Sequence, residues 1–421
     1  MSGAGGALRE LRQLGQAAAV ADDAAVARLV AMLDRLPDRG EADRVLDPVR
    51  PRLRALGLKR PLGLPRLLFL PLDGAILPPS RWSRGAPAVP RSALPMLAAA
   101  VQAALGPEGA AIAAGCAPHV TTDTDAVAAL GGRLWPAAAM ALPERPPAGW
   151  AQTGLAVADY APIAALCRPL FQAGPAIWAA LAASGSGPPT ELVRAALQAV
   201  APAGPGPLAA ALATLLLRAS EPGAVAQLAA GMDATARTVA LQALEQVLEA
   251  PPPPFATLDP LAAADLALLT AHRLDDLEHC ALLGAERQRQ VQACRRAADE
   301  ACRAGFLAAA ERQLVAPTLK LAAAPAVSDA EVAAIEDGAR RLRTLDSAGR
   351  KLGGAPAYDR ALRDLTASLG VLGQQARNPA GLQPVDLARS IEILAGPEAA
   401  MAVLRDQLST GTPIGSPLPA R

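Results

Sequence analysis

Apolar residues recur at helical spacing along most of the chain, most regularly near its C-terminal end. Residues 356–375 carry five apolar side chains at alternating steps of four and three residues, namely Tyr358, Leu362, Leu365, Leu369 and Leu372. This spacing places them along one seam of a helix, and such a seam faces other helices. Residues 329–351 repeat the pattern, so we predict a helical bundle with coiled-coil-like seams over residues 258–409.

Shorter apolar runs, each ended by glycine or proline, fill residues 92–249. They predict successive helices at about 92–105, 107–115, 123–141, 156–168, 171–183, 190–201, 207–219, 222–230 and 233–248. A rhythm of one helix per roughly 15–20 residues resembles the stacked helical pairs of α-solenoids. Because no residue signature recurs from helix to helix, we predict an irregular or solenoid-like multi-helix domain over residues 1–250.

Four consecutive prolines, Pro251 to Pro254, mark the clearest boundary in the chain. Consecutive prolines adopt an extended polyproline conformation and cannot continue a helix. A chain of 421 residues exceeds the usual size of a single core, so two domains are expected. We therefore place a proline linker at 251–257, before the bundle, and expect a disordered tail at 410–421.

The composition predicts an all-α fold. Much of the apolar content is alanine, and aromatic residues make up only 2% of the chain. Alanine is the strongest helix former, whereas the β-branched and aromatic residues that favour strands are scarce. Small side chains each bury little surface, so the stability of the fold must come from many contacts.

The charges nearly cancel, with 40 basic and 39 acidic residues, and this balance excludes a generally basic nucleic-acid-binding protein. Residues 50–91 depart from the balance, because they hold nine basic residues and a single acid, Asp73. This basic segment also contains the apolar run from Leu67 to Leu70, as well as Trp82. Its many prolines forbid a long helix or a central strand.

The basic segment has two interpretations. As an anion-binding surface it would use one tryptophan and five arginines, namely Arg60, Arg66, Arg81, Trp82, Arg84 and Arg91. Arginines contact phosphates, and a tryptophan can stack on a base. As a structural plug, the apolar run and the tryptophan would fill the helical core, while the arginines satisfy helix ends or acidic faces. We favour the plug.

A metal site is a further hypothesis. If residues 260–282 are helical, His272, Asp276 and His279 lie at positions i, i+4 and i+7 on one face, where they could bind a divalent transition metal. No HExxH motif, EF-hand loop or pair of CxxC motifs strengthens this hypothesis. A polar helix face that happens to carry two histidines is the interpretation we favour.

The function prediction rests on the absence of recognisable chemistry. Phosphate-binding glycine loops are missing, and the three histidines lack the setting of a Ser-His-Asp relay. We therefore predict a helical interaction or scaffold protein without a cofactor, whose partner is another protein, and favour a non-catalytic role. Nucleic-acid or phosphate association through residues 50–91 is the alternative, and a metal-dependent enzyme using the 272–279 face comes third.

The expected location is cytoplasmic. The five cysteines are widely spaced in a long chain, which favours reduced thiols over a disulfide framework. The N-terminal residues carry charges where a signal peptide needs an apolar core. The longest uncharged windows, 169–190 and 195–217, are broken by proline and glycine, so no membrane span is expected. The sequence leaves the oligomeric state open.

Overall fold

The computed structural model describes residues 13–18, 21, 23–34, 45–46, 49, 53, 60–183, 190–375 and 382–410. Four basic residues of the segment 50–91 lie outside these ranges: Arg50, Arg52, Arg54 and Lys59. The predicted tail also lies outside them, apart from residue 410.

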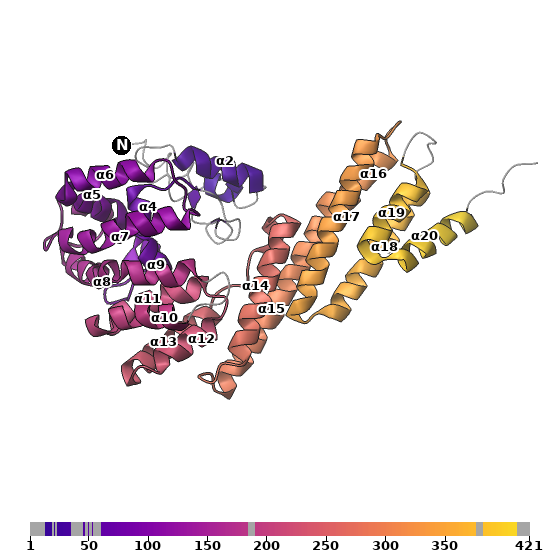
Figure 1. Ribbon diagram of the computed structural model, residues 1–421. Coiled ribbons are helices and arrows are strands. Elements are labelled where there is room, and N and C mark those ends of the chain that lie inside the picture. The colour runs from indigo at the N-terminus through magenta and orange to yellow at the C-terminus, as the bar shows by residue number, and fades with distance from the viewer. Residues whose placement is uncertain are drawn as a thin grey trace, which may run out of the picture.

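Helices dominate the described residues, which confirms the predicted all-α class (Figure 1). The named strands within these ranges are two residues long, β1 (Ile76–Leu77) and β2 (Val89–Pro90), and they pair in parallel. Ile76 lies opposite Val89, and Leu77 lies opposite Pro90.

We call the first group of helices the N-terminal lobe. It comprises α2 (Asp23–Asp34), α4 (Leu64–Leu68), α5 (Leu94–Leu105), α6 (Pro107–Cys116), α7 (Thr124–Ala141), α8 (Tyr160–Gln172), α9 (Gly174–Ala182), α10 (Thr190–Val200), α11 (Pro205–Arg218), α12 (Pro222–Ala230) and α13 (Ala234–Leu248). Prolines begin α6, α11 and α12, where the missing N–H costs no helical hydrogen bond. The starts of these helices are therefore marked by prolines in the sequence.

The helix predicted at 156–168 begins later than expected. Residues 157–159 form a separate 3-10 turn, and α8 begins at Tyr160 rather than near residue 156. The Asp159 carboxylate accepts a hydrogen bond from the Ala156 amide at 2.9 Å, and this bond closes the turn. An Asp side chain that bonds to nearby backbone competes with the helix in this way.

The apolar run of the basic segment lies inside the lobe. It forms α4 and a 3-10 helix, η2 (Leu70–Ala75), and Leu67, Leu68 and Leu72 are fully buried. Phe69 packs against Phe171 of α8, with ring centroids 6.0 Å apart. The run thus fills the core of the lobe, as the plug interpretation requires.

We call the remaining helices the C-terminal array. It comprises α14 (Pro260–Glu278), α15 (Ala285–Ala310), α16 (Ala316–Ala322), α17 (Asp329–Gly349), α18 (Ala355–Gln375), α19 (Pro384–Ala395) and α20 (Pro397–Thr410). The array extends away from the lobe, with α14 beside the lobe and α20 at the far end (Figure 1). A capping box begins α17, because Ser328 and Glu331 satisfy each other's backbone amides.

The predicted seam of α18 is buried. Tyr358 and Leu369 are fully buried and Leu365 is 7% exposed, while Leu362 and Leu372 pack partly buried against the core. The Tyr358 ring meets Phe306 of α15 edge to face, at 6.0 Å between centroids. This packing confirms that the alternating spacing marks a face turned toward other helices.

Helix contacts cross the proline run at 251–254. The first long helix after it, α14, packs both on α12 of the lobe and on α17 of the array. Phe255, inside the predicted linker, is buried against Gly305 of α15. The division into two domains therefore stays a prediction. In the described part of the chain, no helix combines the length and apolar character needed to cross a membrane.

Candidate functional site

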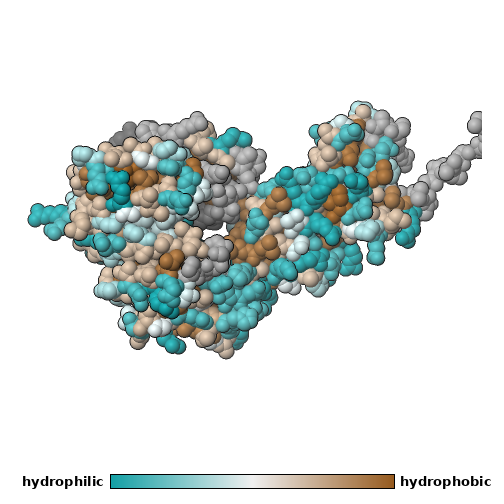
Figure 2. Space-filling view, viewed as in Figure 1, coloured by the Kyte–Doolittle hydropathy of each residue, from teal (hydrophilic) through white to brown (hydrophobic). Residues whose placement is uncertain are grey.

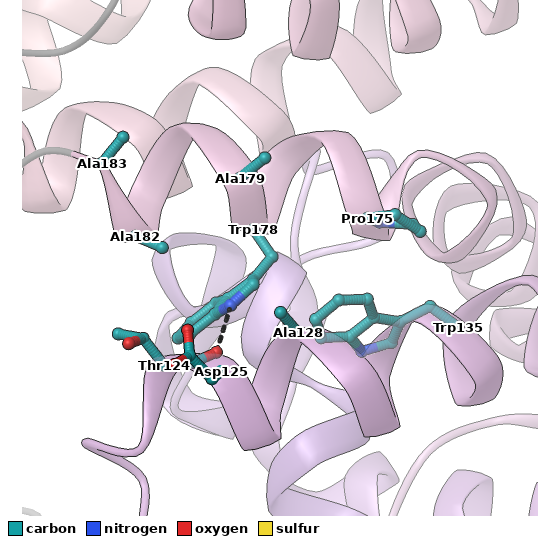
Figure 3. Close-up of a pocket in the computed structure, with 9 residues that line it drawn as sticks. All are labelled: Thr124, Asp125, Ala128, Trp135, Pro175, Trp178, Ala179, Ala182 and Ala183. Carbon is teal, nitrogen blue, oxygen red and sulfur yellow. Dashed lines mark hydrogen bonds between the residues drawn. The ribbon is translucent and has the colours of Figure 1, made fainter.

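A hollow of about 520 Å³ lies between α7 and α9 of the N-terminal lobe. The residues lining it are Thr124, Asp125, Ala128, Trp135, Pro175, Trp178, Ala179, Ala182 and Ala183. The two helices run antiparallel along it, because the start of α7 lies beside the end of α9 (Figure 3). We call this feature the α7–α9 groove.

Two tryptophans form the floor of the groove. Trp135 and Trp178 are almost completely buried, and their ring centroids lie 6.3 Å apart. The Trp135 indole donates a hydrogen bond to the Leu67 carbonyl at 2.9 Å. The Trp178 indole donates to the Thr124 carbonyl at 3.4 Å (Figure 3). Both rings are therefore fixed in orientation by the lobe itself.

Glycines make room for this floor. A Cβ atom at Gly131 of α7, or at Gly174 of α9, would overlap the Trp135 indole. Sequence reasoning missed the groove, because a glycine reveals the ring it accommodates only when the partner helix is known. The one available signal was a tryptophan in each of two predicted helices, 123–141 and 171–183, which a further predicted helix at 156–168 separates.

The chemistry of the groove suits binding rather than catalysis. Its walls are mainly alanine and proline, and among the lining residues only Asp125 and Thr124 carry a carboxylate or a hydroxyl. These two groups do not make a nucleophile with a base. A groove with apolar walls and one rim carboxylate can hold an apolar segment and pair with a positive charge.

The structure gives the residues of the basic segment different local partners. Trp82 is half-buried, packs against the core and donates from its indole to the Ala88 carbonyl at 2.9 Å. Arg84 forms an ion pair with Asp159 at 2.6 Å. The Arg66 guanidinium donates to the Pro61 carbonyl.

The other arginines of this set are also placed. Arg81 is exposed at the end of a short 3-10 turn, whereas Arg60 and Arg91 are half-buried. Asp73, the acid of the segment, pairs with Arg218 of α11 at 3.0 Å. The charged residues of the segment thus have separate partners, which agrees with the plug interpretation. Binding of an anion by these arginines stays a prediction.

The structure does not bring together the three residues of the metal hypothesis. His272 lies 3.4 Å from Glu221, and the His279 ring contacts the Asp275 carbonyl at 2.7 Å. The Asp276 carboxylate accepts hydrogen bonds from the amides of Gly223 and Ala224. Within the described ranges, no group of three or more His, Cys, Asp or Glu side chains is arranged to hold a metal ion.

Asp276 belongs to a structural device that sequence reasoning missed, which we call the α14 clamp. Arg273, one turn earlier, donates to the carbonyls of Leu216 and Ala219 at 3.1 and 2.6 Å, at the end of α11. Asp276 binds the amides that begin α12. Helix α14 of the array therefore satisfies backbone groups at the C-terminal end of α11 and at the N-terminal end of α12.

Burial of the clamp perturbs both charges. It raises the pKa of the Asp276 carboxyl, although the hydrogen bonds from Gly223 and Ala224 lower it. It lowers the pKa of the Arg273 guanidinium, partly offset by the charge of Asp276. The signal in the sequence was a pair of opposite charges three residues apart, Arg273 and Asp276, but other charged residues of the same helix obscure it.

An apolar surface lies on the other half of α14. Leu261, Leu268 and Leu269 are each more than two-fifths exposed, and Figure 2 shows a hydrophobic area over α14 beside the lobe. Spacings of seven and eight residues place these leucines near one another on the helix. Nothing in the structure shows what covers this surface.

Comparison with known proteins gives no relative. No protein-family model, no curated protein and no solved structure matches the chain.

Proposed function

We propose that this chain is a non-catalytic interaction protein that receives a helical segment of a partner protein in the α7–α9 groove. The observation that carries the proposal is the shape and lining of the groove. Its lining residues span Thr124 to Trp135 on α7 and Pro175 to Ala183 on α9. At 1.5 Å per residue these spans are about 16 and 12 Å long, or two to three helical turns.

A groove between two antiparallel helices is a place where a third helix packs. Side-chain ridges of one helix fit the grooves of its neighbours, and the distance between axes falls when the contact residues are small. The alanines at 128, 179 and 182 would allow close approach. Recognition of an amphipathic helix by an apolar groove is a recurring mode of peptide binding.

The rim carboxylate defines the charge of the partner. Asp125 is exposed in the first turn of α7, and within the described ranges it takes part in no ion pair. A lysine or arginine of the partner helix would pair with it. Such a rim pair contributes to specificity and association rate more than to affinity.

A displayed library of amphipathic peptides of about four helical turns, rich in alanine, leucine and lysine, supplies the probe. Peptides selected on the unaltered chain are then measured against two variants. Ala128→Trp fills the groove, whereas Ala129→Trp adds the same ring to an adjacent exposed alanine outside it. Melting temperatures of both variants show whether the fold is kept.

We expect Ala128→Trp to weaken binding at least about tenfold, a loss of about 1.4 kcal/mol, and Ala129→Trp to leave it unchanged. Asp125→Asn should slow association and flatten its dependence on salt. Failure to select any peptide, or equal binding by the two tryptophan variants, would overturn the proposal.

The alternative function, nucleic-acid or phosphate association through residues 50–91, has its own test. A gel shift of duplex and single-stranded nucleic acid at low salt should find no binding by the unaltered chain. Tight binding that is lost in Arg81→Ala with Arg84→Ala, with a log–log salt slope reduced by about 2, would favour the alternative instead.

A cytoplasmic location is part of the same proposal. All five cysteines are free, and four of them are buried. Free, buried thiols fit a reducing compartment.

A further inference from the structure

A group of polar side chains lies where α15, α17 and α18 meet, and we call it the polar cluster. It comprises Asp299 and Cys302 of α15, Asp346 of α17 and Tyr358 of α18. Three of its members are buried, and the fourth, Asp299, is half-buried with its Oδ1 atom shielded from solvent. Cys302 and Tyr358 are fully buried, and Asp346 is 7% exposed. Among the described residues, no hydrogen-bond partner is found for Asp299 Oδ1 or Asp346 Oδ1. The Tyr358 hydroxyl lies beside the Cys302 thiol.

Asp299 lies at the start of α18. Its carboxylate accepts a hydrogen bond from the Gly354 amide, immediately before that helix begins. A Cβ atom at Gly354 would overlap the carboxylate, so glycine allows the close approach. Asp299 therefore caps a helix from another element, as Asp276 does at α12.

The charges around Asp299 offset its burial only in part. On α15 itself, Arg303 attracts the carboxylate and Glu300 repels it. Arg295, also on α15, is already bound by Asp275 and Glu278 of α14. Arg303 is therefore the cation that acts on Asp299.

The other ionisable groups around the cluster are either already in ion pairs or neutral. Arg350 binds Asp346 at 2.9 Å and Asp359 at 2.6 Å, and its guanidinium lies 6.0 Å from the centre of the Tyr358 ring. Burial raises the pKa of the Cys302 thiol to about 11 and raises the pKa of Tyr358 further above its ordinary value. Both groups are therefore neutral across the physiological range.

We propose that the polar cluster is a proton-binding site in which Asp299 takes up one proton from solvent as the pH falls, and that the bound proton stabilises the docking of α18 against α15. A protonated carboxyl is a donor, and the cluster contains a buried acceptor, Asp346 Oδ1, for which the described residues supply no partner. The same proton removes a buried negative charge that lacks a full counter-charge.

The direction of the change in stability with pH follows from the raised pKa of Asp299. Burial raises the pKa of Asp299 above its ordinary value of 3.8. A raised acid pKa means that the folded chain binds the proton more tightly than the unfolded chain does. Stability from this group is therefore lost as the pH rises from the ordinary value through the raised one, and is lowest at neutral and alkaline pH.

The test compares the unaltered chain with Asp299→Asn. Asparagine keeps an oxygen that can accept from Gly354 but cannot carry a negative charge. We expect the variant to melt about 1–3 °C higher near pH 8, and we expect this difference to shrink as the pH falls through the raised pKa of Asp299. Because both proteins carry the same other titratable groups, the effects of those groups cancel in the difference between the two melting temperatures. A difference that does not change with pH would overturn the proposal.

A second measurement covers the case in which Asp299→Asn does not fold. It is carbon-13 NMR of the aspartate carboxyls in the Asp276→Asn variant. Among the aspartates that the structure describes, Asp276 is the other one with a raised pKa, so this variant leaves Asp299 as the remaining one. One carboxyl should still titrate above its ordinary pKa. Its absence would show that Asp299 does not bind the proton.

Discussion

Single glycines determine where the largest side chains of the lobe can lie. The Trp135 indole occupies the space that a Cβ atom would fill at Gly131 and at Gly174. Its ring is completely buried and hydrogen-bonded to the Leu67 carbonyl, so it joins α7, α9 and α4. The floor of the α7–α9 groove thus depends on two residues that have no side chain.

Gly131→Ala should destabilise the chain by about 1–3 kcal/mol, because the new methyl group overpacks the site. The adjacent Gly132 has no atom within 4 Å of a Cβ position, so it supplies a matched control in the same helix. There, alanine should stabilise by roughly 0.5–1 kcal/mol through its higher helix propensity. Urea denaturation measures both. Equal effects of the two changes would mean that Trp135 does not lie over Gly131.

At the scale of elements, apolar spacing identified most helices of the described chain. The seam of α18 and the proline-initiated helices of the lobe follow from local rules, and the structure agrees. The clamp and the groove depend on which helix packs beside which. No local pattern contains that information, because the partners of Arg273, for example, lie 54–57 residues away.

Leu365→Ala should destabilise the chain by about 2–5 kcal/mol, because it removes buried methyl groups and leaves a cavity in the seam. Val371 of the same helix is 53% exposed. Val371→Ala should therefore change the free energy of unfolding by no more than about 0.5 kcal/mol. A negligible cost at Leu365 would contradict the packing of α18 on its neighbours.

At the scale of the whole molecule, the α14 clamp joins two groups of helices that the proline run separates in sequence. Arg273 and Asp276 satisfy backbone groups at both ends of the turn from α11 to α12. Hydrogen bonds to charged groups stabilise more than neutral ones, and buried acceptors left alone are costly. The lobe and the array should therefore stay together even when the chain between them is cut.

A glutamate-specific protease tests this expectation, because Glu249 is exposed just before the proline run. The two fragments should co-elute in gel filtration. Arg273→Met should destabilise the intact chain by about 1.5–3 kcal/mol and let the cleaved fragments separate. Fragments that separate without any mutation would mean that the clamp does not hold the two parts, and would favour two independent domains.

The central claim is that the α7–α9 groove receives a partner helix. Hydrogen–deuterium exchange of the unaltered chain, with and without a selected peptide, tests it most directly. The account predicts slower exchange in α7 and α9 at the groove, with no change over the apolar surface of α14. Protection over Leu261, Leu268 and Leu269 of α14, with α7 and α9 unchanged, would contradict the account and place the interaction on α14 instead.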